Sequence, residues 1–183
     1  MNAHPSIFTV GHSTHPIETL IGLLSAQAIT LLTDVRSYPS SRRWPQFNQA
    51  ELQQSLEGAA IAYQWAKTLG GRRGSGRTNS PHTAWEHPAF RAYADYTETP
   101  EFAAGLNALF NPALEFRAAI MCSEGLWWRC HRRIISDYLK LRGWTVWHIM
   151  PNGNVVDHLL PEFATIDGAR IIYDGGQQSL NLK

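Results

Sequence analysis

Both cysteines of the chain fall in one short segment that also carries acid–base and cationic side chains. Cys122 and Cys130 lie eight positions apart, Glu124 stands between them, and His131 follows the second cysteine. A cysteine reacts as its thiolate, and a nearby cation or helix N-terminus lowers the pKa of the thiol. Imidazole and carboxylate groups supply proton transfer. The segment therefore predicts a catalytic site formed by Cys122, Glu124, Cys130 and His131.

The sequence leaves three interpretations of Cys122 open. It is a nucleophile or sulfur carrier, a small buried hydrophobic residue, or a metal ligand with Cys130, His131 and a fourth group such as His12. The C-x7-C-H spacing is not a standard zinc pattern. We therefore expect no cofactor under the first interpretation and zinc or iron under the third. Neighbouring helical residues point about 100° apart, so Cys130 and His131 are not both expected to face one atom.

Short apolar runs predict the strands that position these residues. They cover residues 7–10, 29–35, 61–65, 118–121 and 144–149. Helical spacing predicts helices from residue 16 and over 48–57, 87–97, 99–110 and 129–142, with Asn48 and Thr99 as caps. This alternation predicts a single three-layer, Rossmann-like α/β domain with a mostly parallel sheet of about five strands. The first two strands are expected to pair directly.

Two further segments have a less regular pattern. Residues 70–86 predict a flexible basic loop, and residues 151–183 a C-terminal extension in which 171–173 could add an edge strand. Net charge +1 does not indicate a partner by itself. No apolar run approaches the ~20 residues of a membrane span, and no signal peptide is recognisable. Two cysteines predict reduced thiols, so we expect a cytoplasmic protein without a membrane partner.

Polar residues also follow the other predicted strands. His12 and Ser13 follow the first strand, Asp34 and Arg36 end the second, and His148 ends the last. Ligands of open parallel sheets bind beyond the carboxyl ends of the strands. We therefore expect His12 and Asp34 among the catalytic residues and Ser13 and Arg36 among the binding residues.

Arginine, glycine and tryptophan residues supply a second kind of signal. The glycine-rich segment 70–77 matches neither a Walker P-loop nor a dinucleotide fingerprint, but glycine backbone and arginine side chains can hold a phosphate. Arginines beside aromatic rings suit a nucleotide or an unstacked base. A solvated loop and core tryptophans are the alternative. The predicted substrate-binding residues are Ser13, Arg36, Arg72, Arg73, Arg77, Trp127, Trp128 and Arg132.

The chain resembles the family called domain of unknown function 488. The likeness is carried by residues 9–13 (TVGHS), 34–40 (DVRSYPS), 45–48 (PQFN), 69–71 (LGG), 121–124 (MCSE) and 130–132 (CHR). It spans about residues 7–150 and leaves the C-terminal segment outside. The resemblance implies a compact α/β domain whose strand-end motifs look like an active site, without an agreed reaction or substrate.

Together these patterns predict a thiol-dependent hydrolase or transferase acting on a phosphate-bearing small molecule or nucleic acid, by hydrolysis or by group or sulfur transfer. Cys122 is the expected nucleophile, Glu124 or His131 the proton-transfer group, and Arg36, Arg132 and residues 70–77 the anion clamp. The alternatives are a non-catalytic nucleic-acid-binding module and a metal-site protein using Cys122, Cys130 and a histidine.

Overall fold

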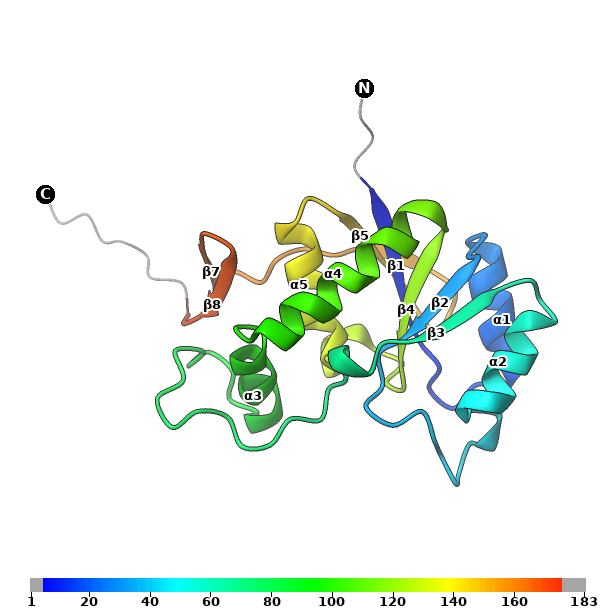
Figure 1. The fold of residues 1–183 in the computed structure, drawn as a ribbon, viewed down its shortest axis with the longest axis horizontal. Helices are drawn as coiled ribbons and strands as arrows, with labels where there is room; N and C mark the ends of the chain where they lie inside the picture. The colour runs from blue at the N-terminus through cyan, green and yellow to red at the C-terminus, as the bar shows by residue number, and fades with distance from the viewer. Residues whose placement is uncertain (1–4, 176–183) are drawn as a thin grey trace, which may run out of the picture.

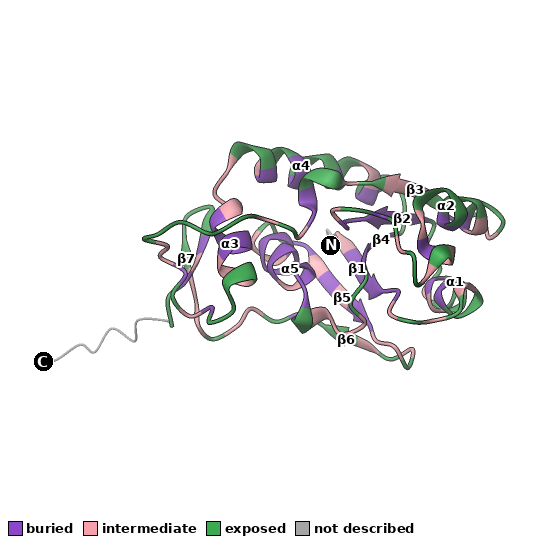
Figure 2. Ribbon diagram, turned by 90° about the horizontal axis from the view of Figure 1, so that it is seen from below, coloured by how far each residue is buried: buried purple, intermediate pink, exposed green. Residues whose placement is uncertain are grey.

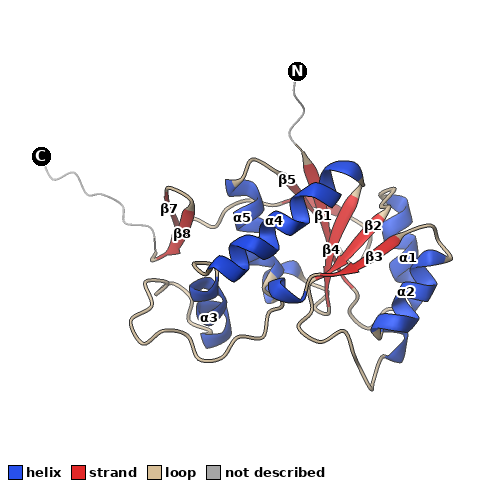
Figure 3. Ribbon diagram, viewed as in Figure 1, coloured by secondary structure: helices blue, strands red, loops and turns tan. Residues whose placement is uncertain are grey.

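The computed structural model describes residues 5–175. A central sheet lies between helices α1 and α2 on one side and α4 and α5 on the other (Figures 1 and 3). The strands are β1 (Ser6–Gly11), β2 (Leu31–Asp34), β3 (Ala62–Trp65), β4 (Ala118–Cys122), β5 (Thr145–Ile149), β6 (Val155–Asp157), β7 (Ala164–Asp167) and β8 (Arg170–Tyr173). The helices are α1 (Ile17–Ala26), α2 (Gln49–Glu57), α3 (Pro88–Tyr96), α4 (Pro100–Glu115) and α5 (Arg132–Leu141). Short 3-10 turns are η1 (Pro45–Phe47), η2 (Lys67–Leu69) and η3 (Trp127–Arg129).

The main sheet has the strand order β3-β2-β4-β1-β5-β6. Its first five strands are parallel, and β6 pairs antiparallel with β5. The three-layer, Rossmann-like α/β fold is therefore confirmed. The expected direct pairing of the first two strands is wrong, because β4 lies between them and pairs with both. All five β4 residues are buried, so this strand takes the centre of the sheet.

Alternation along β4 decides which helix layer each side chain meets. Ala119 and Met121 belong to the core shared with α1 and α2, whereas Ile120 and Cys122 belong to the core shared with α4 and α5. The central strands β1, β2 and β4 are mostly buried, while the outward sides of the covering helices are exposed (Figure 2). The period of the strand therefore turns the Cys122 side chain toward α5.

Local contacts explain where several helices begin and end. The Thr99 side chain accepts a hydrogen bond from the Phe102 backbone N–H, as a cap should, and α4 continues through Pro112 to Glu115. The Asn48 side chain does not cap α2, because its Oδ1 accepts from the Ser41 N–H at 2.7 Å. Helix α5 begins three residues later than expected because η3 and an extended residue precede it.

The C-terminal segment adds two separate pieces of structure. Strand β6 is the edge strand of the main sheet. Residues 171–173 form part of β8, which pairs with β7 in a hairpin of its own, so their placement at an edge of the main sheet is wrong. The side chains of Ile171 and Tyr173 fill the core beside α5. Among residues 5–175, no helix combines the length and apolar character needed to cross a membrane.

Candidate active site

The loops after β1 and β4 meet at the carboxyl edge of the sheet. Gly11 lies opposite Cys122, and the backbone N–H groups of His12 and Ser13 donate to the carbonyls of Cys122 and Ser123 at 3.0 and 2.9 Å. The loop after β1 runs to α1 on one face, and the loop after β4 runs to α5 on the other. This reversal is where ligands bind in open α/β sheets.

Gly11 permits the close approach of these two loops. A Cβ atom at this position would lie 1.8 Å from the carbonyl oxygen of Glu124. Ser13, two residues after Gly11, has a φ of +50°. This left-handed conformation costs free energy in a residue other than glycine. The backbone is therefore specialised at the point where the loops after β1 and β4 touch.

A cleft of about 930 Å³ opens at this junction. Five of the side chains that line it are buried, namely His12, Arg36, Cys122, Cys130 and His131. Exposed lining residues form its outer rim and include Tyr38, Arg72, Glu124, Trp128 and Arg129. The structure therefore brings the predicted thiols, both histidines and Arg36 to one inner wall.

His131 is held as a hydrogen-bond acceptor for Cys122. Its Nε2 lies 2.9 Å from the carbonyl oxygen of Val35, which can only accept, so Nε2 carries a proton. Nδ1 then has the lone pair and lies 3.9 Å from Cys122 Sγ. Gly71 packs against this ring, since a Cβ there would lie 2.4 Å from Nδ1. The Cys122 thiol can thus pass its proton to His131.

Cys130 reaches the same point from the other side. The sulfur atoms of Cys122 and Cys130 and a ring nitrogen of His131 all lie within 4.8 Å of one another. The expectation that Cys130 and His131 diverge is wrong. Cys130 is extended, with φ −142° and ψ 171°, and His131 precedes the first residue of α5, so helical spacing does not apply to them.

The two thiols differ in acidity. The Cys130 thiol, as a hydrogen-bond donor to the thiolate, lowers the pKa of Cys122 well below its ordinary value, and the charges of His131 and Arg132 lower it further against the effect of burial. Burial raises the pKa of Cys130, and its hydrogen bond to Cys122 raises it further. Cys122 is therefore the more acidic of the two thiols.

Arg132 lies behind the thiols and does not line the cleft. Its side chain is fully buried, with Nε donating to Cys130 Sγ at 3.1 Å, Nη1 to Thr9 Oγ1 at 3.3 Å and Nη2 to the Glu124 carbonyl. Within residues 5–175 no carboxylate forms an ion pair with it. Arg132 was predicted to form part of an anion clamp, but the structure places it behind the cleft wall, beside the sulfur of Cys130.

Asp34 acts on Arg36 instead of facing the cleft. Both of its oxygens accept from the Arg36 guanidinium, at 2.9 and 3.0 Å from Nε, and the Tyr63 hydroxyl donates to Oδ2 at 3.0 Å. Asp34 is fully buried and is not among the lining residues. It fixes the orientation of Arg36, which does line the cleft.

Both nitrogens of His12 are occupied. Nδ1–H donates to the Ser13 carbonyl at 2.9 Å, and Nε2 accepts from Arg36 Nη1 at 3.3 Å. Burial and the Arg36 charge lower the pKa of His12 to about 4. The ring stacks on Phe47 with centroids 4.1 Å apart. His12 is therefore a neutral wall of the cleft that positions Arg36.

Only one of the three predicted loop arginines lines the cleft. The Arg72 guanidinium lies 5.6 Å from the Tyr38 ring centroid, and its backbone N–H donates to Ser37 Oγ at 2.8 Å. Arg73 donates to the Thr68 carbonyl at 2.6 Å and covers the Tyr96 ring. The loop arginines thus serve different purposes.

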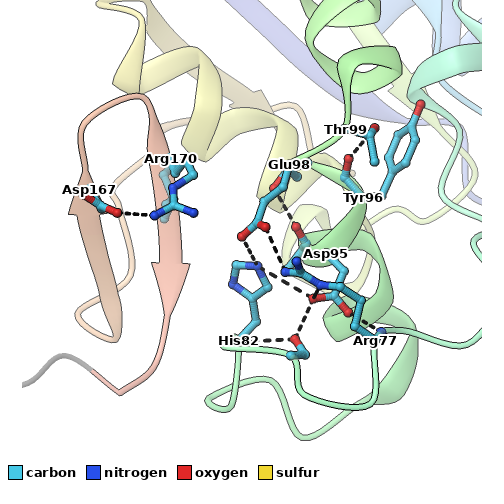
Figure 4. A network of polar contacts seen from close by, with 12 residues as sticks. Arg77, His82, Asp95, Tyr96, Glu98, Thr99, Asp167 and Arg170 are labelled. Carbon is cyan, nitrogen blue, oxygen red and sulfur yellow. Dashed lines mark hydrogen bonds and ion pairs between the residues drawn. The ribbon is translucent and has the colours of Figure 1, made fainter.

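Arg77 anchors the basic loop to α3 and to the turn that follows it (Figure 4). Its Nε lies 3.2 Å from Asp95 Oδ1 and its Nη2 lies 2.9 Å from Glu98 Oε2. The Ser80 hydroxyl also donates to Asp95, and buried His82 lies 3.4 Å from Glu98. Arg77 is not among the residues that line the cleft, and both of its ion pairs hold it against the α3 region.

The two adjacent tryptophans have different surroundings. Trp128 lines the cleft with 40% of its surface exposed. Trp127 instead stacks on His148, with ring centroids 4.1 Å apart and planes 4° apart. His148 itself is buried beneath Trp127 and does not line the cleft. Tyr38 and Phe90 are lining aromatic residues that the sequence reasoning did not single out, although Tyr38 lies within the 34–40 motif.

Glu124 offers its carboxylate to the cleft opening. The side chain is exposed, and in the described part of the chain it has no ion-pair partner. Its backbone carbonyl, by contrast, is fixed by Arg132. A carboxylate on the rim can accept a proton or a hydrogen bond from a bound molecule.

The three potential metal ligands of this site are Cys122, Cys130 and His131. A structural zinc site takes four protein ligands. His12, the expected fourth, does not belong to this group, because its nitrogens bind Ser13 and Arg36. The buried guanidinium of Arg132 beside Cys130 also opposes a second cation there.

Comparison with known proteins gives one match. The model of a family described as "Domain of unknown function DUF488" matches residues 16–139. No curated protein and no solved structure matches the chain. The matched segment contains Cys122, Cys130 and His131 and ends before His148.

Proposed function

The chain belongs to the DUF488 family, and from the geometry of its cleft we propose that it is a thiol-dependent hydrolase or transferase. Its proposed substrate carries a phosphate and an aromatic ring, as a nucleotide or an unstacked nucleic-acid base does. The observation that carries this proposal is the pairing of Cys122 Sγ with His131 Nδ1, in which the Val35 carbonyl fixes the protonated nitrogen. A thiolate mechanism requires reduced cysteines, in keeping with the proposed cytoplasmic location.

The chemical step uses Cys122 as the nucleophile. The thiol gives its proton to His131, and the sulfur forms a bond to an electrophilic atom of the substrate while the bond to the leaving group breaks. His131 returns the proton to the leaving group. A water molecule or another acceptor then attacks the same atom, the sulfur leaves as a thiolate, and the proton of the acceptor passes to His131 or Glu124.

The substrate class follows from the composition of the walls. Arg36 on the inner wall and Arg72 and Arg129 on the rim supply guanidinium groups for a phosphate. Trp44 and Trp128 supply faces on which an aromatic ring can stack. This pairing of cations with rings favours a phosphate-bearing aromatic substrate over a purely anionic one.

Alkylation kinetics test the nucleophile. We expect iodoacetamide to label Cys122 with a pH midpoint below that of an ordinary thiol, and Cys122→Ser to abolish the fast-reacting class. Cys130→Ser is the matched variant, because it keeps a hydroxyl donor beside Cys122 and should retain a reactive thiol. An ordinary midpoint for Cys122 in the intact protein would remove the proposed mechanism.

Protection from alkylation tests the substrate class. Adenosine monophosphate should slow labelling of Cys122 more than adenosine or inorganic phosphate alone. Only the nucleotide can contact both the arginines and the tryptophans that line the cleft. Arg72→Ala should weaken this protection, whereas Arg73→Ala should not, since Arg73 faces Thr68 and Tyr96. Equal labelling in the presence of all three compounds would reject the proposed substrate class.

The same preparation separates the two alternatives. A non-catalytic nucleic-acid-binding module would bind single-stranded DNA in a salt-sensitive way, unaffected by Cys122→Ser, and would show ordinary thiol reactivity. A metal centre would give stoichiometric zinc or iron in elemental analysis and slow alkylation that a chelator accelerates. Reactive Cys122 in metal-free protein supports the enzyme.

A further inference from the structure

A chain of buried side chains leads from the thiol pair into the interior beside α5. Arg132 Nη1 donates to Thr9 Oγ1, which lies 2.7 Å from His148 Nδ1. His148 Nε2 lies 2.9 Å from His158 Nδ1. His158 Nε2 lies 2.8 Å from Asp137 Oδ1, and the Tyr173 hydroxyl donates to Asp137 Oδ2 at 2.7 Å. Each of these six side chains is at most 1% exposed, so water does not replace any of their hydrogen bonds.

The two ends of this series of side chains fix the direction of the hydrogen bonds that they make. A guanidinium can only donate, so Thr9 Oγ1 accepts from Arg132, and the hydroxyl hydrogen of Thr9 remains available to donate to His148 Nδ1. A carboxylate can only accept, so His158 Nε2–H donates to Asp137. Neutral His148 and His158 rings that each carry their proton on Nε2 then give every link one hydrogen. All links then point from Arg132 to Asp137.

Electrostatics agree with this arrangement. Burial is the largest cause that lowers the pKa of His148 to about 2, and the Arg132 charge acts in the same direction, so this ring is neutral. Burial raises the pKa of Asp137, and the hydrogen bonds from His158 and Tyr173 oppose that rise. Arg132 has no carboxylate in contact within residues 5–175, so Asp137 at the far end of the chain is the anion to which it is connected.

We propose that Thr9, His148, His158 and Asp137 are positioning residues for the thiol pair, acting through Arg132. They hold the guanidinium with its Nε–H on Cys130 Sγ, which keeps that sulfur and the positive charge of Arg132 beside Cys122. The inference rests on the proposed function, because it concerns the same thiolate. It also gives the C-terminal segment a role, since His158 and Tyr173 lie beyond the family-matched residues.

The first experiment uses one position with a matched pair of variants. Thr9→Val keeps the shape of a buried β-branched residue but removes the hydroxyl that joins Arg132 to His148. Thr9→Ser keeps the hydroxyl. Neither change touches Cys122 directly. The titratable or charged groups that face Cys122, and that both variants retain, are His12, Tyr93, Cys130, His131 and Arg132.

The readout is the pH profile of Cys122 alkylation. Thr9→Val should raise the midpoint by about half a unit to one unit, which is about a threefold to tenfold loss of rate at pH values below both midpoints. Thr9→Ser should retain most of the rate. A merely structural role for Thr9 would lower the melting temperature without moving the midpoint. An unchanged midpoint in folded Thr9→Val would overturn the positioning role.

A second measurement needs no variant. Ring nitrogen chemical shifts of ¹⁵N-labelled protein report which nitrogen carries the proton, and we expect Nε2–H for both His148 and His158. An Nδ1–H tautomer or a charged ring at either position overturns the proposal, whether or not Thr9→Val folds. Ordinary reactivity of Cys122 in the unmodified protein would instead refute the proposed function, so the two failures are distinguishable.

Discussion

Replacing Gly71 by alanine should disable the thiol pair through a single methyl group. The new Cβ would lie 2.4 Å from His131 Nδ1, 2.7 Å from Cγ and 2.9 Å from Cε1, whereas ordinary contact begins near 3.4 Å. To relieve this clash, either the His131 ring or the Gly71 backbone must move by about 1 Å. If the ring moves, it strains the 2.9 Å hydrogen bond to Val35 and the 3.9 Å contact with Cys122.

The neighbouring backbone limits the other way of relieving the clash. The Arg72 N–H donates to Ser37 Oγ at 2.8 Å, and a Cβ on Gly70 would already lie 2.6 Å from the same oxygen. The loop is thus held against the residues that follow β2. We expect the imidazole to move, which should raise the alkylation midpoint by about one pKa unit and lower the alkylation rate about tenfold at pH values below both midpoints.

Gly74→Ala is the matched control, because no atom lies within 4 Å of the Cβ position in the same loop. Its Cys122 should react with iodoacetamide at the rate of the unchanged protein. Its free energy of unfolding should be about 0.5 kcal/mol larger, because alanine makes the unfolded chain less flexible. Stopped-flow alkylation across pH and thermal unfolding measure both variants. A Gly71→Ala protein with the rate and midpoint of Gly74→Ala would refute the reasoning.

Three further predictions concern stability. Gly11→Ala places a Cβ 1.8 Å from the Glu124 carbonyl oxygen, so urea unfolding should show a loss of about 3 kcal/mol; a loss below about 1 kcal/mol would contradict the close approach. Asp34→Asn removes the charge that compensates buried Arg36 and should cost about 3 kcal/mol, while a variant as stable as the original would show that the ion pair is dispensable. The folded pKa of His12, about 4, lies below the ordinary 6.5, so the unfolded state binds a proton first and stability falls as pH drops from 6.5 to 4. That loss is at most about 3 kcal/mol and should be absent in His12→Gln, whereas an identical pH slope in both proteins would argue against it.

The sequence predicted the approach of His12 to Cys122 because each lies at the carboxyl end of a short apolar run that is typical of a buried strand. Parallel strands place their following loops on one edge, so the pairing needed no knowledge of strand order. Strand order itself was not predictable. The hydrophobic period identifies helices and strands but not which strands pair. The position of β4 between β1 and β2 depends on the path that the long connections between strands take across the sheet.

Details of the candidate site depended on backbone shape that spacing does not encode. Cys130 faces Cys122 only because it is extended just before α5, and no residue pattern marks that conformation. The capture of Arg77 by Asp95 and Glu98 needed the position of α3. The link between His148 and His158 had no sequence signal either, because the two residues meet only when β6 pairs with β5.

The antiparallel pairing of β6 has a consequence for any shortened form of the protein. Strand β5 would become the last strand of the sheet if the chain stopped at residue 150, and its hydrogen-bonding groups would be open to other molecules. Truncation at residue 150 would also remove His158 and Tyr173, which leaves the buried carboxylate of Asp137 without these two hydrogen-bond donors. A recombinant fragment that ends at residue 150 should therefore precipitate or self-associate, even though it retains every residue that lines the cleft.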